Sequence, residues 1–84
     1  MSNKKQKQYI KKNNIGTYYY KDPEKTILHR EDGPAAEYTD GTKMWYQNGK
    51  LHREDGTAVE YADGEKEYWY NGNFYSDIKT DKEY

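Results

Sequence analysis

Two pairs of side chains in this sequence have the types and spacing that metal binding or acid–base catalysis requires. His29 and Asp32 form one His-x-x-Asp group, and His52 and Asp55 form a second. Imidazole and carboxylate groups bind zinc and other divalent metals, and they also transfer protons in enzymes. A loop aspartate more often bonds to the backbone amides of its own turn. We therefore expect a structural role without a metal, in which the arginines beside the two histidines pair with nearby acids.

Catalysis is not expected from these groups or from any other pattern in the chain. The sequence contains no cysteine, no glycine-rich phosphate loop and no Ser/His/Asp or Cys/His arrangement. An active centre is normally a single constellation, whereas the His-x-x-Asp group occurs twice. A chain of 84 residues is also too short for the core of a large enzyme. We expect a non-enzymatic protein that needs no cofactor.

Both groups belong to a tandem repeat. Leu28–Lys50 and Leu51–Asn73 align without gaps and are identical at 14 of 23 positions. Turn signals recur about every eight residues, a spacing that suits strands and is too short for helices. The expected structural turns are Asp32-Gly33, Asp40-Gly41, Asn48-Gly49, Asp55-Gly56, Asp63-Gly64 and Asn71-Gly72.

The sequence therefore predicts an all-β fold, a single-layer antiparallel β-meander of tandem 23-residue hairpin repeats. The expected strands are residues 17–20, 25–29, 34–38, 42–47, 50–53, 57–61, 65–70 and 73–76. We divide the chain into a basic N-terminal arm (1–16), the repeat domain (17–76, with full units 28–50 and 51–73 and partial units at the ends) and a C-terminal tail (77–84).

Charges select the pairing register at the Asp-Gly turns. A two-residue turn would place Glu60 opposite Glu67, and like charges across two strands are destabilising. A three-residue loop with a left-handed glycine shifts the register by one residue. It places Glu37 opposite Lys43 and Glu60 opposite Lys66. We expect this second register.

Alternation along the strands then sorts the side chains into two faces. The face that resembles a core carries Ala36, Tyr38, Met44, Tyr46, Val59, Tyr61 and Trp69. The other face mixes charges with rings, and its candidate binding residues are Trp45, Tyr68, Tyr70, Lys43 and Lys66. Tyrosine and tryptophan are enriched at protein interfaces, and rings beside lysines also suit a stacked nucleobase and its phosphate.

Charge is distributed unevenly along the chain. Residues 1–21 contain six lysines and no acid, whereas residues 22–84 contain 8 bases and 15 acids, a balance of −7. A basic arm can bind nucleic acid or an anionic membrane, but a solvated chain end is the simpler interpretation. The sequence contains no membrane-span pattern, and no signal-peptide pattern follows Met1, so we expect a cytoplasmic protein without membrane association.

The segment Trp45–His52, WYQNGKLH, followed by EYADG at residues 60–64, resembles the MORN repeat, a β-hairpin unit of similar period. Residues 29–35 read His-Arg-x-Asp-Gly-Pro-Ala and resemble a MORN-like variant found in bacteriophage and large DNA virus proteins. The second copy has Thr57 in place of the proline. The resemblance covers about residues 17–76 and implies an elongated scaffold that binds partners and does not catalyse a reaction.

Two hypotheses of function follow. The leading one is a protein-binding module, in concrete form a small phage-encoded inhibitor of a host bacterial defence or regulatory protein, acting in the host cytoplasm. The alternative is a nucleotide-binding or nucleic-acid-binding module that uses the sheet aromatics and the basic arm. Because a short meander leaves two open edges, we also expect a homo-oligomer, most simply a twofold dimer.

Overall fold

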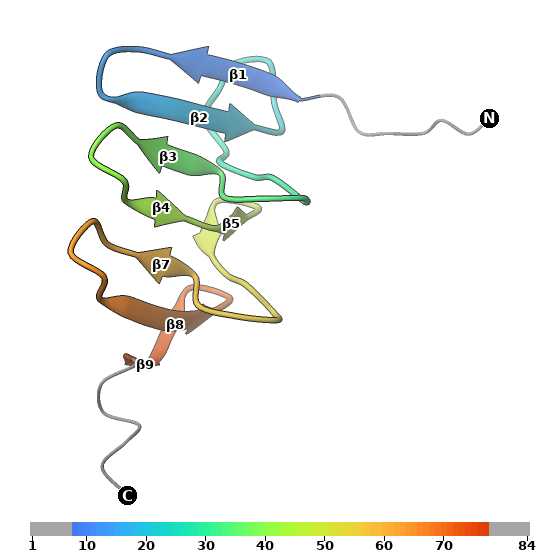
Figure 1. The fold of residues 1–84 in the computed structure, drawn as a ribbon. Coiled ribbons are helices and arrows are strands. Elements are labelled where there is room, and N and C mark those ends of the chain that lie inside the picture. The colour runs from blue at the N-terminus through green and yellow to red at the C-terminus, as the bar shows by residue number, and fades with distance from the viewer. Residues whose placement is uncertain (1–7, 78–84) are drawn as a thin grey trace, which may run out of the picture.

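The computed structural model describes residues 8–77 as a stack of short strands without a helix (Figure 1). The strands are β1 (Tyr9–Lys12), β2 (Gly16–Tyr20), β3 (Ala36–Tyr38), β4 (Lys43–Met44), β5 (Tyr46–Gln47), β6 (Lys50–Leu51), β7 (Val59–Glu60), β8 (Lys66–Tyr70) and β9 (Asn73–Asp77). Seven strands form one antiparallel sheet in the order β1-β2-β3-β4-β7-β8-β9, and β5 pairs with β6. The predicted all-β antiparallel class is confirmed. Within this part of the chain, no helix has the length and hydropathy that a membrane span requires.

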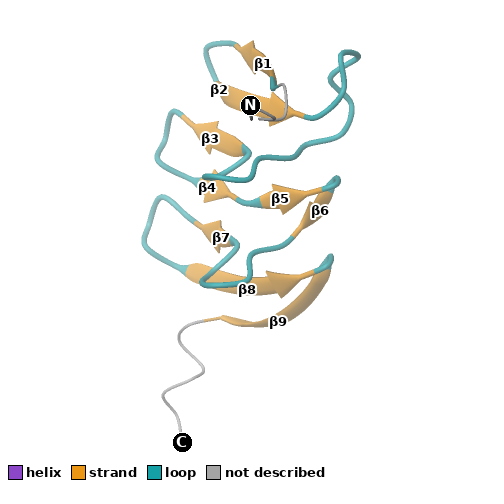
Figure 2. Cartoon of the chain, turned by 90° about the vertical axis from the view of Figure 1, so that its right-hand side faces the viewer, coloured by secondary structure: helices purple, strands orange, loops and turns teal. Residues whose placement is uncertain are grey.

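Two kinds of turn connect the strands on opposite sides of the stack (Figure 2). At the Asp-Gly turns, Gly41 and Gly64 have φ angles of 100° and 96°, and the Gly41 amide donates to the Tyr38 carbonyl. This is the three-residue loop with a left-handed glycine. At the Asn-Gly turns both central residues have positive φ, 51° for Asn48 and 82° for Gly49. That pattern is typical of a two-residue type I′ hairpin.

The first Asp-Gly turn also has a side-chain support. The Thr42 amide donates to Asp40 Oδ1 at 2.9 Å. This backbone hydrogen bond, followed by the Thr42 hydroxyl, lowers the pKa of the Asp40 carboxyl below its ordinary value. The carboxylate form of Asp40 is therefore part of the folded turn.

The pairing register agrees with the prediction from charge. Glu37 lies opposite Lys43, and Glu60 lies opposite Lys66. The sheet also places Lys43 opposite Glu60. A ladder of alternating charge thus crosses the four strands β3, β4, β7 and β8, and opposite charges at facing positions favour this register over a slipped one.

The expected strand 42–47 is divided at Trp45. Its amide donates to the Ala58 carbonyl, beside β7, whereas its carbonyl accepts from the His52 amide, beyond β6. The chain therefore changes its pairing partner at this residue, and β4 and β5 belong to different sheets. Such a change of partner cannot be read from period-two alternation, which is the same on both sides of the break.

The expected strand 25–29 forms only one isolated bridge, between Tyr20 and Leu28. Asp22 organises a loop instead, because its carboxylate accepts hydrogen bonds from the amides of Thr26 and Ile27. These bonds offer the backbone an alternative to strand pairing.

Conversely, residues 9–12, within the expected arm, form β1 and pair with β2 in full register. The expected arm residues 1–7 and tail residues 78–84 lie outside the described part of the chain.

The core is small. Ala35, Ala36, Ala58 and Val59 are its fully buried apolar residues in the described part of the chain, joined by the buried polar residues His29, Thr42, His52 and Thr57. Of the face expected to be the core, Ala36 and Val59 are buried, whereas Tyr61 is exposed. Because so few hydrophobic side chains are buried, hydrogen bonds and ion pairs of the polar loops must contribute a large part of the stability of this fold.

Candidate functional site: the arginine loops and the C-terminal edge

The His-Arg-Glu-Asp-Gly segments form two equivalent loops, which we call the first arginine loop (residues 29–33) and the second arginine loop (residues 52–56). In the first, the Arg30 guanidinium lies 3.9 Å from the centre of the Tyr19 ring. In the second, the Arg53 guanidinium lies 4.0 Å from the Trp45 ring. Arg30 is thus stacked on a ring of β2, and Arg53 on the ring of Trp45 between β4 and β5, an attractive cation–π arrangement in both cases.

The glycine of each loop provides the space for this stack. A Cβ atom on Gly33 would lie 3.1 Å from the Arg30 guanidinium carbon, and one on Gly56 would lie 3.1 Å from that of Arg53. Neither glycine is among the residues with positive φ. Gly33 and Gly56 lie in bends of the chain, and the absence of a side chain at both positions leaves room for a guanidinium against the backbone.

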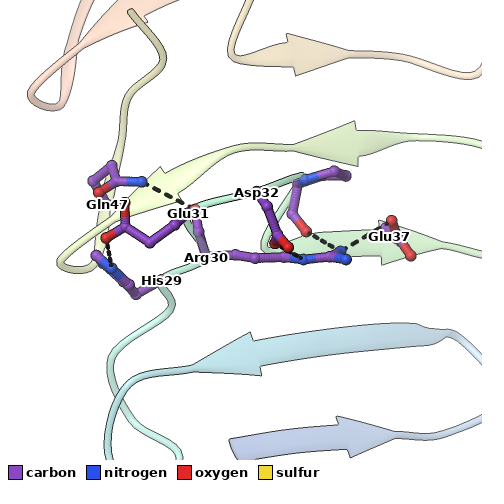
Figure 3. A network of polar contacts seen from close by, with 7 residues as sticks. His29, Arg30, Glu31, Asp32, Glu37 and Gln47 are labelled. Atoms are coloured by element: carbon purple, nitrogen blue, oxygen red, sulfur yellow. Dashed lines mark hydrogen bonds and ion pairs between the residues drawn. The ribbon is translucent and has the colours of Figure 1, made fainter. Parts of the chain in front are cut away.

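Carboxylates and a carbonyl hold the Arg30 guanidinium in place (Figure 3), and Arg53 has equivalent partners. Arg30 Nε donates to Asp32 at 3.1 Å, and Arg30 Nη1 donates to the Pro34 carbonyl at 3.1 Å and to Glu37 at 3.4 Å. Arg53 repeats these contacts with Asp55, the Thr57 carbonyl and Glu60. The expected pairing of the arginines with local acids is confirmed, whereas Asp32 and Asp55 bond to arginine and not to turn amides.

Each histidine uses both of its ring nitrogens. His29 Nδ1 accepts a hydrogen bond from the Asn48 amide at 2.9 Å, and Nε2 lies 2.7 Å from Glu31. His52 accepts from Asn71 at 2.9 Å and faces Glu54 at 3.3 Å. The histidine therefore ties its loop to the Asn-Gly hairpin of the same unit. Among residues 8–77 no group of three or more His, Cys, Asp or Glu side chains is arranged to hold a metal ion.

A cleft of about 820 Å³ separates the two arginine loops. It is lined by Arg30, Glu31, Asp32, Gly33, Trp45, Gln47, His52, Arg53, Glu54 and Asp55. Its two guanidinium groups already contact carboxylates, and its four acids are exposed. The cleft therefore carries more acid than base, which favours a cation over a phosphate as its occupant.

A second hollow, of about 530 Å³, lies on the side of the Asp-Gly turns. It is also acidic, since Asp40, Asp63, Glu65 and Glu67 line it. Tyr61 in its wall donates to Glu67 at 3.2 Å. Partial burial, and then the Glu67 charge, raise the pKa of the Tyr61 hydroxyl above its ordinary value. Neither hollow provides a free cation for an anionic ligand.

The five candidate binding residues do not form one patch of free side chains. Trp45 lies under Arg53 and in the cleft, while Lys43 and Lys66 face glutamates across the strands. Tyr68 is half-buried and pairs with Ser76 of β9. Tyr70 is exposed, and its ring lies 4.4 Å from that of His52. Of the five, Tyr70 is the most accessible ring.

Phe74 and Tyr75 are 50% and 66% exposed on β9 and were not among the predicted binding residues. Phe74 packs edge-on against Trp69, and Tyr75 stacks on Tyr70 at 6.3 Å between ring centres. β9 is the last strand of the sheet in the described part of the chain. The available signal was the repeat itself, because these rings stand where a third unit would begin. We call β9 with the exposed rings of Tyr70, Phe74 and Tyr75 the C-terminal edge.

Comparison of the chain with protein-family models, curated proteins and solved structures finds no match.

Proposed function

We propose that this chain is a non-enzymatic protein-binding module and that it binds its partner through the C-terminal edge. The observation that supports this proposal is the concentration of exposed rings, Tyr70, Phe74 and Tyr75, beside the outer strand of the sheet. Exposed aromatic groups beside an open strand edge suit an added strand of a partner, with backbone hydrogen bonds for affinity and rings for specificity. Phe74 and Tyr75 are consecutive residues of β9 and lie on opposite faces, so a strand added at this edge would meet a ring on each face.

The polar groups support a structural role for the arginine loops and so disfavour catalysis. Both nitrogens of each histidine are engaged, and both guanidinium groups are paired. A general acid or base needs access to a substrate proton, and these groups are directed to their own loop. The proposed function is therefore recognition without a reaction.

The proposed partner is a protein of the host cell. The likeness to MORN-type repeats of bacteriophage and large DNA virus proteins supports a small inhibitor that binds a host defence or regulatory protein. A twofold pairing of β9 strands would give the predicted homodimer through the same edge. Because both use one surface, self-association and partner binding would compete.

Binding of a nucleotide in the cleft between the arginine loops is the second candidate. The cleft volume of about 820 Å³ and the Trp45 ring favour it. The four exposed carboxylates at the rim oppose it, since a phosphate would approach like charges. A titration with ATP at low and physiological salt distinguishes the two, because the protein-binding proposal predicts no binding at either.

Affinity capture with matched surface variants tests the leading proposal. Phe74→Ser and Tyr75→Ser are expected to weaken partner binding by about 2 kcal/mol, typical of hot-spot rings. Ile10→Ser is the control, because Ile10 is also 50% exposed and also lies on an outer strand, β1, at the opposite end of the sheet. Loss of binding by Ile10→Ser alone, with the β9 variants unaffected, would contradict the proposal. Circular dichroism checks that each variant keeps the strand content of the parent.

A further inference from the structure

Three aromatic residues occupy equivalent places along the sheet. Thr17 on β2, Lys43 on β4 and Lys66 on β8 lie in one row of paired residues across the sheet. Two residues after each of them comes a ring, and these rings are Tyr19, Trp45 and Tyr68. Trp45 and Tyr68 are also separated by one repeat of 23 residues. The three rings therefore form successive steps of one column on the same face of the sheet.

Arginine covers the first two rings and not the third. Arg30 stacks on Tyr19 and Arg53 stacks on Trp45. One repeat after Arg53 the sequence has Ser76, which pairs directly with Tyr68 across β8 and β9. In the described part of the chain no cation stacks on Tyr68. The whole sequence contains only the two arginines already used.

We infer that Tyr68 is a docking site for an arginine side chain supplied by the partner protein. This inference rests on the proposed protein-binding function and names one contact of that interface. The two filled sites show what the ring accepts, a guanidinium stacked at about 4 Å. A guanidinium is planar and weakly hydrated, so it stacks on an aromatic ring better than an ammonium group does.

The partner arginine comes from a different protein and not from a second copy of this chain. Each arginine of a second copy is held by a ring that precedes its unit and by a carbonyl and carboxylates of its own unit. Transfer to Tyr68 of a neighbour would break all of these contacts to form one. A protein with an uncommitted arginine has no such cost.

The filled sites also indicate the sequence around the guest arginine. In both loops the arginine is followed three residues later by the glycine that leaves room for the guanidinium. The partner segment is therefore expected to contain Arg-x-x-Gly in a loop. The hexapeptide Leu-His-Arg-Glu-Asp-Gly, which copies residues 51–56, is the simplest probe with this pattern.

The test is a titration of the full chain, labelled with ¹³C-tyrosine, with this hexapeptide and with a matched peptide that carries neutral citrulline in place of arginine. The arginine peptide is expected to shift the Tyr68 ring signals and to leave those of Tyr19, which is already covered, unchanged. Tyr68→Phe identifies the signals, and its retained ring should bind the peptide as the parent does. Tyr68→Leu should weaken binding by about fivefold or more. Equal binding of both peptides, or unchanged binding by Tyr68→Leu, would overturn the inference.

Ser76→Arg provides an independent test in the opposite direction. It introduces an arginine at the position that pairs with Tyr68 in the sheet register, so it should raise the melting temperature and block the arginine peptide. Ser76→Gln is the control for added bulk without charge and should do neither. If Ser76→Arg binds the peptide as tightly as the parent, the inference is wrong.

Capture of the partner separates this inference from the proposed function. Loss of the partner with Phe74→Ser but not with Tyr68→Leu would leave the protein-binding function standing and remove the arginine site. Peptide binding at Tyr68 in a chain whose β9 variants still capture the partner would support the arginine site and contradict the proposed use of the C-terminal edge.

Discussion

The two repeat units contain the same five loop residues but hold them differently. Arg30 Nε lies 3.1 Å from Asp32, whereas Arg53 Nε lies 3.5 Å from Asp55. The side chain of Arg30 is 20% exposed and that of Arg53 is 29% exposed. The histidine–glutamate distances follow the same order, 2.7 Å in the first loop and 3.3 Å in the second. The first arginine loop is the tighter of the two.

Residues outside the five-residue motif account for this difference. Glu60 accepts a hydrogen bond from the Thr57 hydroxyl at 2.9 Å and lies 3.6 Å from Arg53. In the first unit Pro34 replaces the threonine and donates nothing, so Glu37 is free for Arg30. Gln47 also donates to the Arg30 carbonyl at 3.0 Å, a contact that the second unit replaces with a ring beside His52. The repeated five-residue motif therefore sets which groups are in contact, and the residues around the motif set how short those contacts are.

Removal of the histidines should have the largest effect and should be similar in the two units. His29→Ala and His52→Ala are each expected to lower the free energy of unfolding by about 2–3 kcal/mol, since each removes a buried side chain and the acceptor for an Asn-Gly turn amide. Denaturant melts measure the loss. Asparagine places an acceptor near the Nδ1 position, so His29→Asn and His52→Asn should recover part of it. A cost confined to one unit would show that the histidine contacts are not equivalent.

A double-mutant cycle in each loop measures how strongly the glycine and the arginine are coupled. Gly33→Ala is expected to cost about 1 kcal/mol, because the new Cβ displaces the Arg30 guanidinium from its ring. With Arg30→Ala present the same change should become neutral or stabilising, because alanine restricts the unfolded chain. The cycle of Gly56 and Arg53 should give the same sign and a smaller coupling, as expected for the looser loop. Additive effects of the two substitutions in both loops would show that the glycine is not needed to make room for the arginine.

The smallest effect concerns the acid stability of the first Asp-Gly turn. The Thr42 amide, and then its hydroxyl, hold the pKa of Asp40 below its ordinary value of 3.8. A carboxyl whose pKa is lowered by folding stabilises the protein above its unfolded pKa, and this contribution is lost as the pH falls through the folded value. Asp40→Asn should therefore melt slightly below the parent near pH 7, and this difference should shrink as the pH falls below about pH 4. A parallel acid-induced loss in both chains would exclude this contribution.

Local features could be predicted because their causes are local. The Asp-Gly and Asn-Gly turns follow from residues that tolerate positive φ, as Gly41 and Asn48 show. The register followed from charges that face each other only a few residues from the turn, Glu37 with Lys43 and Glu60 with Lys66. Each of these predictions used contacts that span less than one repeat.

The candidate site was harder to predict because its contacts join neighbouring units. Nothing next to Trp45 in the sequence indicates that Arg53 will cover it, so it was selected as a free ring. Lys43 and Lys66 were also selected beside these rings, and the predicted register had already placed them opposite Glu37 and Glu60. Phe74 and Tyr75 were not selected, because their exposure depends on the sheet ending at β9 in the described part of the chain.

The main turns, the antiparallel class and the opposite-charge register could be read from the residues alone, since propensity and pairing act over short separations. The folded arrangement of the units set which rings are covered, where the chain changes partner at Trp45, and the pairing of residues 9–12 as β1. These features depend on how one unit stacks on the next, and that stacking is set by packing and side-chain bonds between residues far apart in the chain.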